Sequence, residues 1–408
     1  MNYEQAMSKL AAYGQEHVLK YYDELSVEKQ NWLLNQISTI DFSVLDTLKK
    51  EPSADERGKI EPLPVVQIPE IKVYRQQFLE TGLEAVNQGK VGAVLLAGGM
   101  GTRLGSNAPK GTYDIGITQP VYIFQRLIEN LLDVVKAADY WVPLYVMTSE
   151  KNYDATIRFM REHNFFGYNR ESVTFFKQEM APACDFNGKV YMEDKWKIST
   201  SPNGNGGWYS SMYKWGFAQR AMMEGVEWLN VFSVDNVLQR IADPRFVGAV
   251  INRNCAAGSK VVRKVAPDEK VGVMCLEDGK PSIVEYYELT EEMKQAVDDK
   301  GEPAYNYGVI LNYVFRISDL EEIREKKLPL HVVKKKIAAL DENGKMMDPQ
   351  EPNGYKFEQL VLDMIHELDS CLPYEVVRSR EFAPVKNATG VDSVDTAREL
   401  CLRNGIML

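Results

Sequence analysis

Apolar residues in the first 48 positions recur every three or four residues, which is the spacing of one face of a helix. Ser26 stands before the second of these runs and has a side chain suited to a helix N-cap. From Lys49 to Glu70 prolines stand among charged residues, a composition typical of an extended linker. A further helix is expected over about residues 71–88. The pattern therefore predicts a helical N-terminal extension and linker over residues 1–88.

From Val91 onward, short apolar runs alternate with longer amphipathic segments. Val91–Leu96 is apolar throughout, as expected for a strand that is buried on both faces. The same reasoning predicts further strands over residues 142–147, 173–177 and 229–234, with helices over residues 120–136, 152–163 and 209–223. This order of elements predicts an α/β fold with a doubly wound, mainly parallel, Rossmann-like sheet.

The later part of the chain departs from this order. Residues 259–285 contain short strand patterns with hairpin spacers such as Glu277-Asp278-Gly279, which favours a mixed or antiparallel layer there. After residue 330 come a basic cluster, a helix pattern over about residues 355–368 and a strand pattern over residues 374–378. We therefore expect an α/β core over residues 89–330 and a small C-terminal α+β region over residues 331–408, in keeping with a length of 408 residues.

The net charge and the apolar runs indicate which classes of binding partner the protein is expected to lack. The chain carries 48 basic and 58 acidic side chains and a net charge of −10, whereas a nucleic-acid binder needs basic surface to neutralise phosphates. The N-terminus lacks the basic start and apolar run of a signal peptide, and no stretch reaches the roughly 18 apolar residues of a membrane span. We therefore expect a cytoplasmic protein with neither a nucleic-acid nor a membrane partner. The five cysteines form no C-x-x-C pair, so they give no zinc or redox signature.

The strongest chemical signal follows the first predicted core strand. It reads Leu96-Ala97-Gly98-Gly99-Met100-Gly101-Thr102-Arg103-Leu104-Gly105, with Pro109-Lys110-Gly111 a few residues later. Glycines at a strand end let the backbone approach a ligand and expose N–H groups to anions, and Arg103 and Lys110 add positive charge for phosphate oxygens. Neither the Walker spacing nor the dinucleotide G-x-G-x-x-G spacing fits, so the loop indicates a phosphate site of another kind.

This segment resembles the L-A-G-G-x-G-T-R-L-G-x-x-x-P-K-G signature of the UTP:sugar-1-phosphate uridylyltransferases, and the resemblance extends over roughly residues 90–390. Within that family the likeness is greatest to the UDP-N-acetylglucosamine pyrophosphorylases. The resemblance implies the Rossmann-like nucleotide-diphospho-sugar transferase fold. It also implies that Arg103 and Lys110 are catalytic and that the nucleotide contacts this stretch through Leu96, Ala97, Gly98, Gly99 and Lys110.

Two later segments match contacts that the family makes. Gln178, within Phe175–Met180, matches the uracil-reading glutamine, and its amide offers both a donor and an acceptor to the imide edge of that base. Gly204-Asn205-Gly206-Gly207 matches the G-N-G-G of the UDP-N-acetylglucosamine enzymes, whereas eukaryotic UDP-glucose enzymes read G-H-G-D there. By resemblance, Gly204 contacts the nucleotide and Asn205 contacts the sugar.

Charged residues add to the nucleotide contacts. Asp235 ends the strand pattern over residues 229–234, and a carboxylate beside a triphosphate is unfavourable unless it binds a cation. Asp235 is therefore the candidate ligand for Mg²⁺ and a nucleotide contact. Lys335 and Lys336 both fit the family's phosphate-binding lysine in H-x-x-x-K-K-I, and the pattern does not choose between them.

The sugar contacts match less completely. By resemblance, Glu285 and Tyr286 contact the sugar ring and Lys386 binds the sugar phosphate. Where the UDP-N-acetylglucosamine enzymes read N-A-G-N-I, this chain reads Asn306-Tyr307-Gly308-Val309-Ile310, so Val309 replaces a hydrogen-bonding side chain. N-acetylglucosamine-1-phosphate is the expected sugar substrate, and glucose-1-phosphate or galactose-1-phosphate is the alternative.

The resemblance implies a reversible uridylyl transfer. A sugar-1-phosphate oxygen attacks the α-phosphorus of UTP in line, a UDP-sugar forms and pyrophosphate leaves, with Mg²⁺ as the cofactor. Because the attacking phosphate is already ionised, catalysis needs positioning and charge neutralisation rather than a general base. A catalytically silent nucleotide-sugar-binding protein is the remaining alternative, and the presence of Arg103, Lys110 and Asp235 argues against it. The pattern leaves the oligomeric state open.

Overall fold

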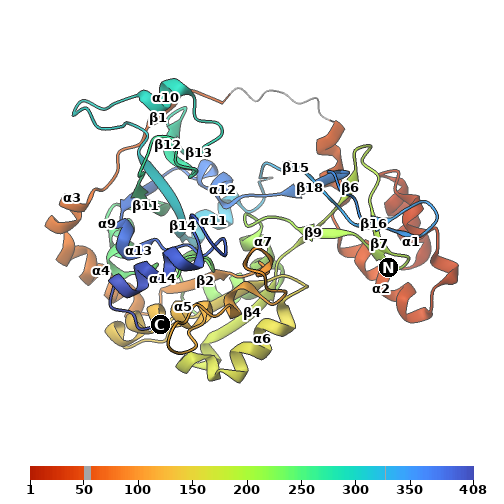
Figure 1. Cartoon of the computed structure of the whole chain (residues 1–408), viewed down its shortest axis with the longest axis horizontal. Helices are drawn as coiled ribbons and strands as arrows, with labels where there is room; N and C mark the ends of the chain where they lie inside the picture. Colours follow the sequence, from red (N-terminus) through yellow and green to blue (C-terminus); the bar gives the residue numbers. More distant parts are fainter. Residues whose placement is uncertain (50–56, 327) are drawn as a thin grey trace. The chain divides into compact units, whose positions relative to one another are not determined.

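The computed structural model describes residues 1–49, 57–326 and 328–408. The chain divides into two compact units, each assembled from separate stretches of sequence (Figure 1). The first unit comprises Met1–Glu56, Glu179–Gly207 and Leu328–Val361, and the second comprises Arg57–Gln178, Trp208–Lys327 and Leu362–Leu408. The sequence pattern predicted three consecutive regions instead, over residues 1–88, 89–330 and 331–408, and that division stays a prediction. Part of the predicted linker, residues 50–56, lies outside the described residues.

A ten-stranded sheet formed by the described strands is the centre of the second unit. Its strands are β1 (Ile60–Pro62), β2 (Val91–Leu96), β3 (Leu144–Thr148), β4 (Val173–Lys177), β10 (Trp228–Ser233), β11 (Ala257–Arg263), β12 (Val273–Glu277), β13 (Lys280–Val284), β14 (Tyr307–Arg316) and β19 (Cys371–Glu375). Strands β10, β2, β3 and β4 lie in that order and run parallel, as the alternation of strand and helix patterns predicted.

The other half of the sheet is antiparallel except for the β11–β19 pair, so the sheet as a whole is mixed. The mixed or antiparallel layer predicted over residues 259–285 is confirmed, because β12 and β13 form an antiparallel hairpin through Asp278 and Gly279. Strand β14 lies antiparallel to β10 with Asn312 opposite Phe232, and its first residues pair with β11 beyond the end of β10. Functional side chains can therefore come from both halves of the sheet at the carboxyl ends of the parallel strands.

Helices surround this sheet. They are α3 (Ile68–Val73), α4 (Arg75–Asn87), α5 (Ile123–Ala138), α6 (Tyr153–Glu162), α7 (Trp208–Lys214), α8 (Phe217–Met223), α9 (Pro244–Asn252), α10 (Glu291–Gln295), α11 (Ile317–Ile323), α12 (Val361–Glu367), α13 (Arg378–Glu381) and α14 (Val394–Arg403). Every residue of β2 is buried, as a strand covered on both faces requires. Helices α4 and α9 pack closely because both have glycine at the contact: a Cβ on Gly82 would lie 1.7 Å from the carbonyl oxygen of Pro244. None of the helices in the described residues is long and apolar enough to cross a membrane.

Four local predictions need correction. The strand predicted over residues 374–378 lies earlier, as β19, and residues 378–381 form α13. The helix predicted over residues 209–223 is two helices, α7 and α8, because Gly216 adopts the left-handed conformation (φ +75°) and ends the first of them. The helix predicted from about residue 355 begins only at Val361, since residues 354–358 form strand β18. The helix predicted over residues 71–88 is interrupted at Tyr74, where α3 ends.

The first unit has its own apolar core. Its elements are α1 (Tyr3–Ala11), α2 (Val27–Thr39), β5 (Met180–Pro182), β6 (Cys184–Asp185), β7 (Met192–Asp194), β8 (Lys197–Ile198), β9 (Thr200–Pro202), β15 (His331–Lys335), β16 (Ala339–Leu340), β17 (Met346–Met347) and β18 (Gly354–Glu358). The buried face of α2 packs with side chains from β6 and β18, including Phe357. Ser26 accepts a hydrogen bond from the Lys29 amide, as its predicted capping role requires.

A buried ion cluster that the sequence pattern did not indicate joins three elements of the second unit. The Lys260 ammonium on β11 is fully buried and lies 2.6 Å from Glu381 and 3.0 Å from Asp243. Burial alone lowers the pKa of Lys260, but the two carboxylates outweigh it and raise this pKa above its ordinary value. Lys260 is therefore charged at neutral pH, and its two partners compensate the loss of hydration.

We expect Glu381→Gln to lower the free energy of unfolding by about 2 kcal/mol, because it removes one charge-assisted hydrogen bond from a buried cluster. Urea unfolding followed by tryptophan fluorescence measures this change. The control is Glu399→Gln on α14, which breaks an exposed ion pair with Arg403 and should cost less than about 0.5 kcal/mol. Equal effects of the two substitutions would contradict the stabilising role of the buried cluster.

Candidate active site

The glycine-rich segment after β2 forms a loop that folds back on itself. Leu96 and Ala97 are buried, Gly98 is partly exposed and Gly99 is exposed. The backbone amide of Gly101 donates to the carbonyl oxygen of Ala108 at 2.9 Å, and the amide of Lys110 donates to that of Gly99 at 3.1 Å. These bonds bring Lys110 back beside the start of the loop. We refer to residues 97–111 as the glycine loop.

Gln178 lies against this loop. It follows β4, and its backbone amide donates to the carbonyl oxygen of Thr148 at 2.7 Å. A Cβ on Gly98 would lie 2.6 Å from the Nε2 atom of Gln178, so only glycine leaves room for this side chain. Gln178 is only 8% exposed, and its side-chain amide has no hydrogen-bond partner among the described residues. A buried amide with unused donors and acceptor is available to a ligand.

The Lys110 ammonium lies 2.7 Å from the Asp235 carboxylate, which follows the end of β10. The backbone carbonyl of Asp235 accepts a hydrogen bond from the amide of Val385 at 2.9 Å. Lys386 is the next residue, so its backbone lies near Asp235. Lys386 in turn forms an ion pair with Asp392 at 3.0 Å. The structure thus brings together Lys110, Asp235 and the Lys386 segment, which are far apart in the sequence.

Asn236 holds the Lys386 segment against the end of β10. Its side chain is 2% exposed, donates to the carbonyl oxygen of Glu381 at 2.7 Å and accepts from the amide of Ala383 at 2.9 Å. The sequence pattern did not single out this residue. A polar residue beside Asp235 at the end of an apolar strand was the only signal that pointed to it.

Arg103 lies in a single 3₁₀ turn (Thr102–Leu104) within the glycine loop, and its side chain is exposed. Among the described residues it forms neither an ion pair nor a side-chain hydrogen bond. Gly105, two residues later, has φ +76° and ends the turn in a conformation that favours glycine. Arg103 is therefore free to contact an anion at the mouth of the loop.

Glu285, Gly272 and Val309 come together near the start of β14. A Cβ on Gly272 would lie 3.4 Å from the Oε1 atom of Glu285, and the Val309 amide donates to the Gly272 carbonyl at 2.9 Å. The Glu285 backbone amide donates to Glu288, which is itself paired with Arg57 at 2.8 Å. Tyr286, the other predicted sugar contact, is 38% exposed and packs edge-on against Tyr287.

The remaining predicted residues belong to the first unit. Gly204 has φ +70°, and a Cβ there would lie 2.1 Å from the carbonyl oxygen of Gln359. The Asn205 side chain accepts a hydrogen bond from the amide of Val361 at 2.9 Å. Lys335 at the end of β15 and Lys336 after it are both exposed, and neither side chain pairs with a described residue. The choice between the two lysines stays open.

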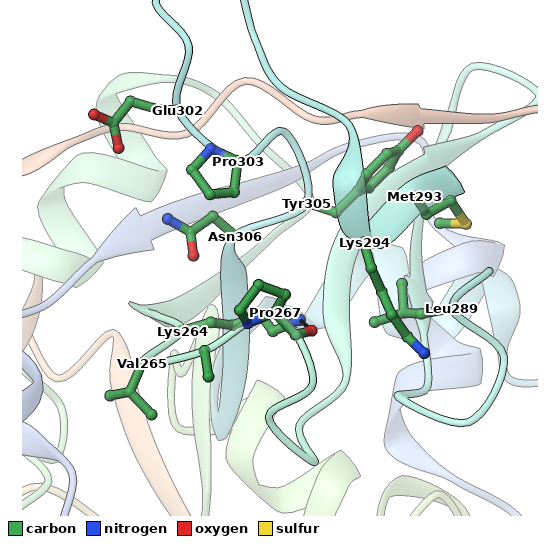
Figure 2. Close-up of a pocket in the computed structure, with 11 residues that line it drawn as sticks. Lys264, Val265, Pro267, Leu289, Met293, Lys294, Glu302, Pro303, Tyr305 and Asn306 are labelled. Atoms are coloured by element: carbon green, nitrogen blue, oxygen red, sulfur yellow. Dashed lines mark hydrogen bonds between the residues drawn. The ribbon is translucent and has the colours of Figure 1, made fainter. Parts of the chain in front are cut away.

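A separate cavity of about 220 Å³ lies in the second unit, where the loop after β11 faces α10 and the segment before β14 (Figure 2). Its lining residues are Lys264, Val265, Ala266, Pro267, Leu289, Met293, Lys294, Glu302, Pro303, Tyr305 and Asn306. None of the predicted site residues lines this cavity. Lys264 and Lys294 are already bonded to Pro267 and Glu291 respectively.

Within residues 1–49, 57–326 and 328–408, no three His, Cys, Asp or Glu side chains lie close enough to hold a metal ion by themselves. Asp235 offers a single carboxylate, which is 29% exposed and paired with a lysine. Mg²⁺ commonly binds through one or two carboxylates together with substrate phosphates and water. The donor set at Asp235 therefore fits an ion that arrives with phosphate groups and does not fit a metal site made by protein ligands alone.

The chain is similar to proteins of one known family. A family model described as UTP–glucose-1-phosphate uridylyltransferase matches residues 44–396. The human UDP-N-acetylhexosamine pyrophosphorylase-like protein 1 is 36% identical over 97% of this chain and 83% of its own length. The UDP-N-acetylglucosamine pyrophosphorylase of Saccharomyces cerevisiae is 36% identical over 97% of this chain and 86% of its own length.

Among solved structures, the uridine diphosphate N-acetylglucosamine pyrophosphorylase of Trypanosoma brucei superposes with a TM-score of 0.82 and 26% identity, covering 98% of this chain and 84% of that one. The family model covers most of the chain, including the glycine loop, Gln178, Asp235 and Lys386. The chain therefore belongs to the UTP–glucose-1-phosphate uridylyltransferase family, whose members are UDP-sugar pyrophosphorylases.

Proposed function

We propose that this protein forms a UDP-sugar and pyrophosphate from UTP and a sugar-1-phosphate, and that N-acetylglucosamine-1-phosphate is its preferred sugar substrate. The observation that carries the proposal is the convergence of Lys110, Asp235 and the Lys386 segment beside the glycine loop. Lys110 and Lys386, which pair with Asp235 and Asp392 in the structure, suit the phosphates of two substrates, and Asp235 suits a divalent ion that arrives with those phosphates. The Saccharomyces cerevisiae relative, which is named UDP-N-acetylglucosamine pyrophosphorylase, supports the choice of sugar.

Each residue has a role in this proposal. Leu96, Ala97, Gly98 and Gly99 contact the nucleotide, and the Gln178 amide reads the uracil edge. Arg103 and Lys110 stabilise the negative charge of the triphosphate and the leaving pyrophosphate. Lys386 holds the attacking sugar phosphate, already ionised, in line with the α-phosphorus. The other proposed contacts are Gly204 and Lys335 or Lys336 for the nucleotide, and Asn205, Glu285 and Tyr286 for the sugar.

Asp235 is the residue that would hold Mg²⁺, which when bound supplies charge neutralisation and template effects at the phosphates. In the structure the Asp235 carboxylate forms an ion pair with Lys110. When a nucleotide binds, the lysine can turn to the phosphate oxygens, which leaves the carboxylate available to the cation. This exchange of partners explains why an ion pair occupies the centre of the proposed site.

Val309 favours a second candidate, the same transfer to glucose-1-phosphate or galactose-1-phosphate. Its backbone lies next to Gly272 and hence near Glu285, and its aliphatic side chain offers no hydrogen bond to an N-acetyl group. Pyrophosphate release from UTP with N-acetylglucosamine, N-acetylgalactosamine, glucose and galactose 1-phosphates decides between the candidates. The highest kcat/KM with N-acetylglucosamine-1-phosphate supports the first, and the highest with glucose- or galactose-1-phosphate supports the second.

Gln178→Leu should lower kcat/KM for UTP at least about tenfold, because one or two hydrogen bonds to the base are lost from a buried site. The ratio of kcat/KM for UTP over that for CTP should fall as well, since the leucine reads neither base. Steady-state kinetics with both nucleotides test this, with thermal unfolding to confirm that the variant folds. An unchanged ratio would mean that Gln178 does not read the base.

A further inference from the structure

We infer that Asn152 is a positioning residue for the proposed nucleotide site: its side chain turns two carbonyl groups of the glycine loop inward, so that neighbouring amides face the nucleotide. The inference rests on the proposed function, because it assigns these amides to the bound UTP. Asn152 was not among the predicted site residues. It stands directly before α6, and its side chain is fully buried.

All the hydrogen bonds of the Asn152 side chain point to the loop or to the turn before α6. Its Nδ2 atom donates to the carbonyl oxygens of Ala97 at 2.9 Å and Gly99 at 3.2 Å. Its Oδ1 atom accepts from the backbone amide of Ser149 at 2.8 Å and from the Ser149 hydroxyl at 3.0 Å. One side chain thus holds both sides of Gly98, the residue against which Gln178 packs.

The direction of the amides follows from peptide geometry. In a trans peptide the carbonyl of one residue and the N–H of the next point to opposite sides, and no described peptide bond is cis. Because the Ala97 and Gly99 carbonyls face Asn152, the N–H groups of Gly98 and Met100 face away from it. No described residue accepts a hydrogen bond from the amides of Gly98, Gly99 or Met100. These unpaired donors form a surface suited to a nucleotide.

A role in capping α6 does not account for this arrangement. An asparagine at an N-cap normally accepts a hydrogen bond from an amide in the first turn of its own helix. Asn152 occupies the N-cap of α6, but its side chain makes no such bond within the described helix. Its Nδ2 group instead donates to carbonyl oxygens of the glycine loop and so orients the backbone there.

The test compares Asn152→Asp and Asn152→Ala with Asn230→Asp. The aspartate removes both donors and places a charge against two carbonyl oxygens, whereas the alanine removes the donors without adding charge. Asn230 is a matched control: it is equally buried and donates to Asn312 and Tyr313, but it lies within β10 away from the loop. Titration calorimetry measures UTP binding in the presence of Mg²⁺, at a temperature where all variants are folded.

We expect both Asn152 variants to bind UTP at least tenfold more weakly than the wild type, and Asn230→Asp to bind within about twofold of it. The KM for the sugar phosphate should change little in the Asn152 variants. A general loss of structure would raise this KM as well. Wild-type affinity in Asn152→Ala, or equal weakening in Asn230→Asp, would overturn the inference while leaving the proposed function intact. If the wild type itself fails to bind UTP, the proposed function fails and the inference with it.

Discussion

Arg103→Ala is expected to lower kcat by between about 100- and 1,000-fold and to change KM for UTP by less than about threefold. The guanidinium is exposed, and among the described residues it forms no ion pair that must be broken before it contacts an anion. Negative charge grows on the leaving pyrophosphate as the reaction proceeds, so this cation stabilises the transition state more than the bound UTP. Steady-state kinetics of pyrophosphate release measure both constants.

Arg75→Ala is the control for this prediction. Arg75 is likewise exposed, but it stands at the start of α4 and is not a predicted site residue. Its replacement should leave both constants unchanged. Because neither arginine supports the fold through a described partner, both variants should unfold at the wild-type temperature. A parallel rise in KM and fall in kcat for Arg103→Ala would place its effect on substrate binding and contradict a transition-state role.

The second large effect is expected at the Lys110–Asp235 pair. Asp235→Asn should lower kcat by about 100-fold or more and raise the Mg²⁺ concentration needed for half the maximal rate, because the carboxylate that pairs with Lys110 loses its charge. Lys110→Met should lower kcat by a similar factor without that shift in Mg²⁺ dependence. The double variant should lose less than the product of the two factors, since the residues act on the same phosphates.

The chain offers a matched control for this pair. Lys90 and Glu227 form an exposed ion pair at 3.1 Å. Lys90 stands directly before β2 and Glu227 directly before β10, so the pair lies at the amino ends of these strands. Lys110 and Asp235 follow the carboxyl ends of the same two strands. Glu227→Gln should leave kcat and the Mg²⁺ dependence unchanged. If Asp235→Asn also left the Mg²⁺ dependence unchanged, the proposed role of this carboxylate in holding the cation would be wrong.

Local sequence patterns predicted the elements that carry the site better than they predicted the whole chain. The bounds of β2 and β4 agree with the predicted ranges: β2 is apolar throughout, and β4 is rich in the β-branched and aromatic residues that favour strands. Lys110 and Asp235 follow strands that the pattern predicted, and they meet because these two strands are parallel neighbours in the sheet, which the pattern did not specify. Lys386 joins them only through bonds from residues 381–385 to Asp235 and Asn236, which no local pattern reveals.

What local patterns missed depends on contacts between distant segments. The carboxylates that pair with Lys260 come from α13 and from the residue before α9. In the sequence, Lys260 looks like any charged residue in a strand. Asn152 reads as a helix cap, and its bonds to Ala97 and Gly99 become visible only in three dimensions. Each compact unit combines three stretches that are separated in the sequence, whereas local patterns along the chain favour consecutive regions.

The most direct test of the proposed function is ³¹P NMR of the wild-type protein incubated with UTP, N-acetylglucosamine-1-phosphate and MgCl₂. The account predicts that the three UTP resonances and the sugar-phosphate resonance decline together, while the paired diphosphate resonances of a UDP-sugar and a single pyrophosphate resonance grow in equal amounts. Added inorganic pyrophosphatase should drive the conversion further, because the transfer is reversible. Loss of UTP without loss of the sugar phosphate, with inorganic phosphate or UMP as the product, would contradict the proposed uridylyl transfer.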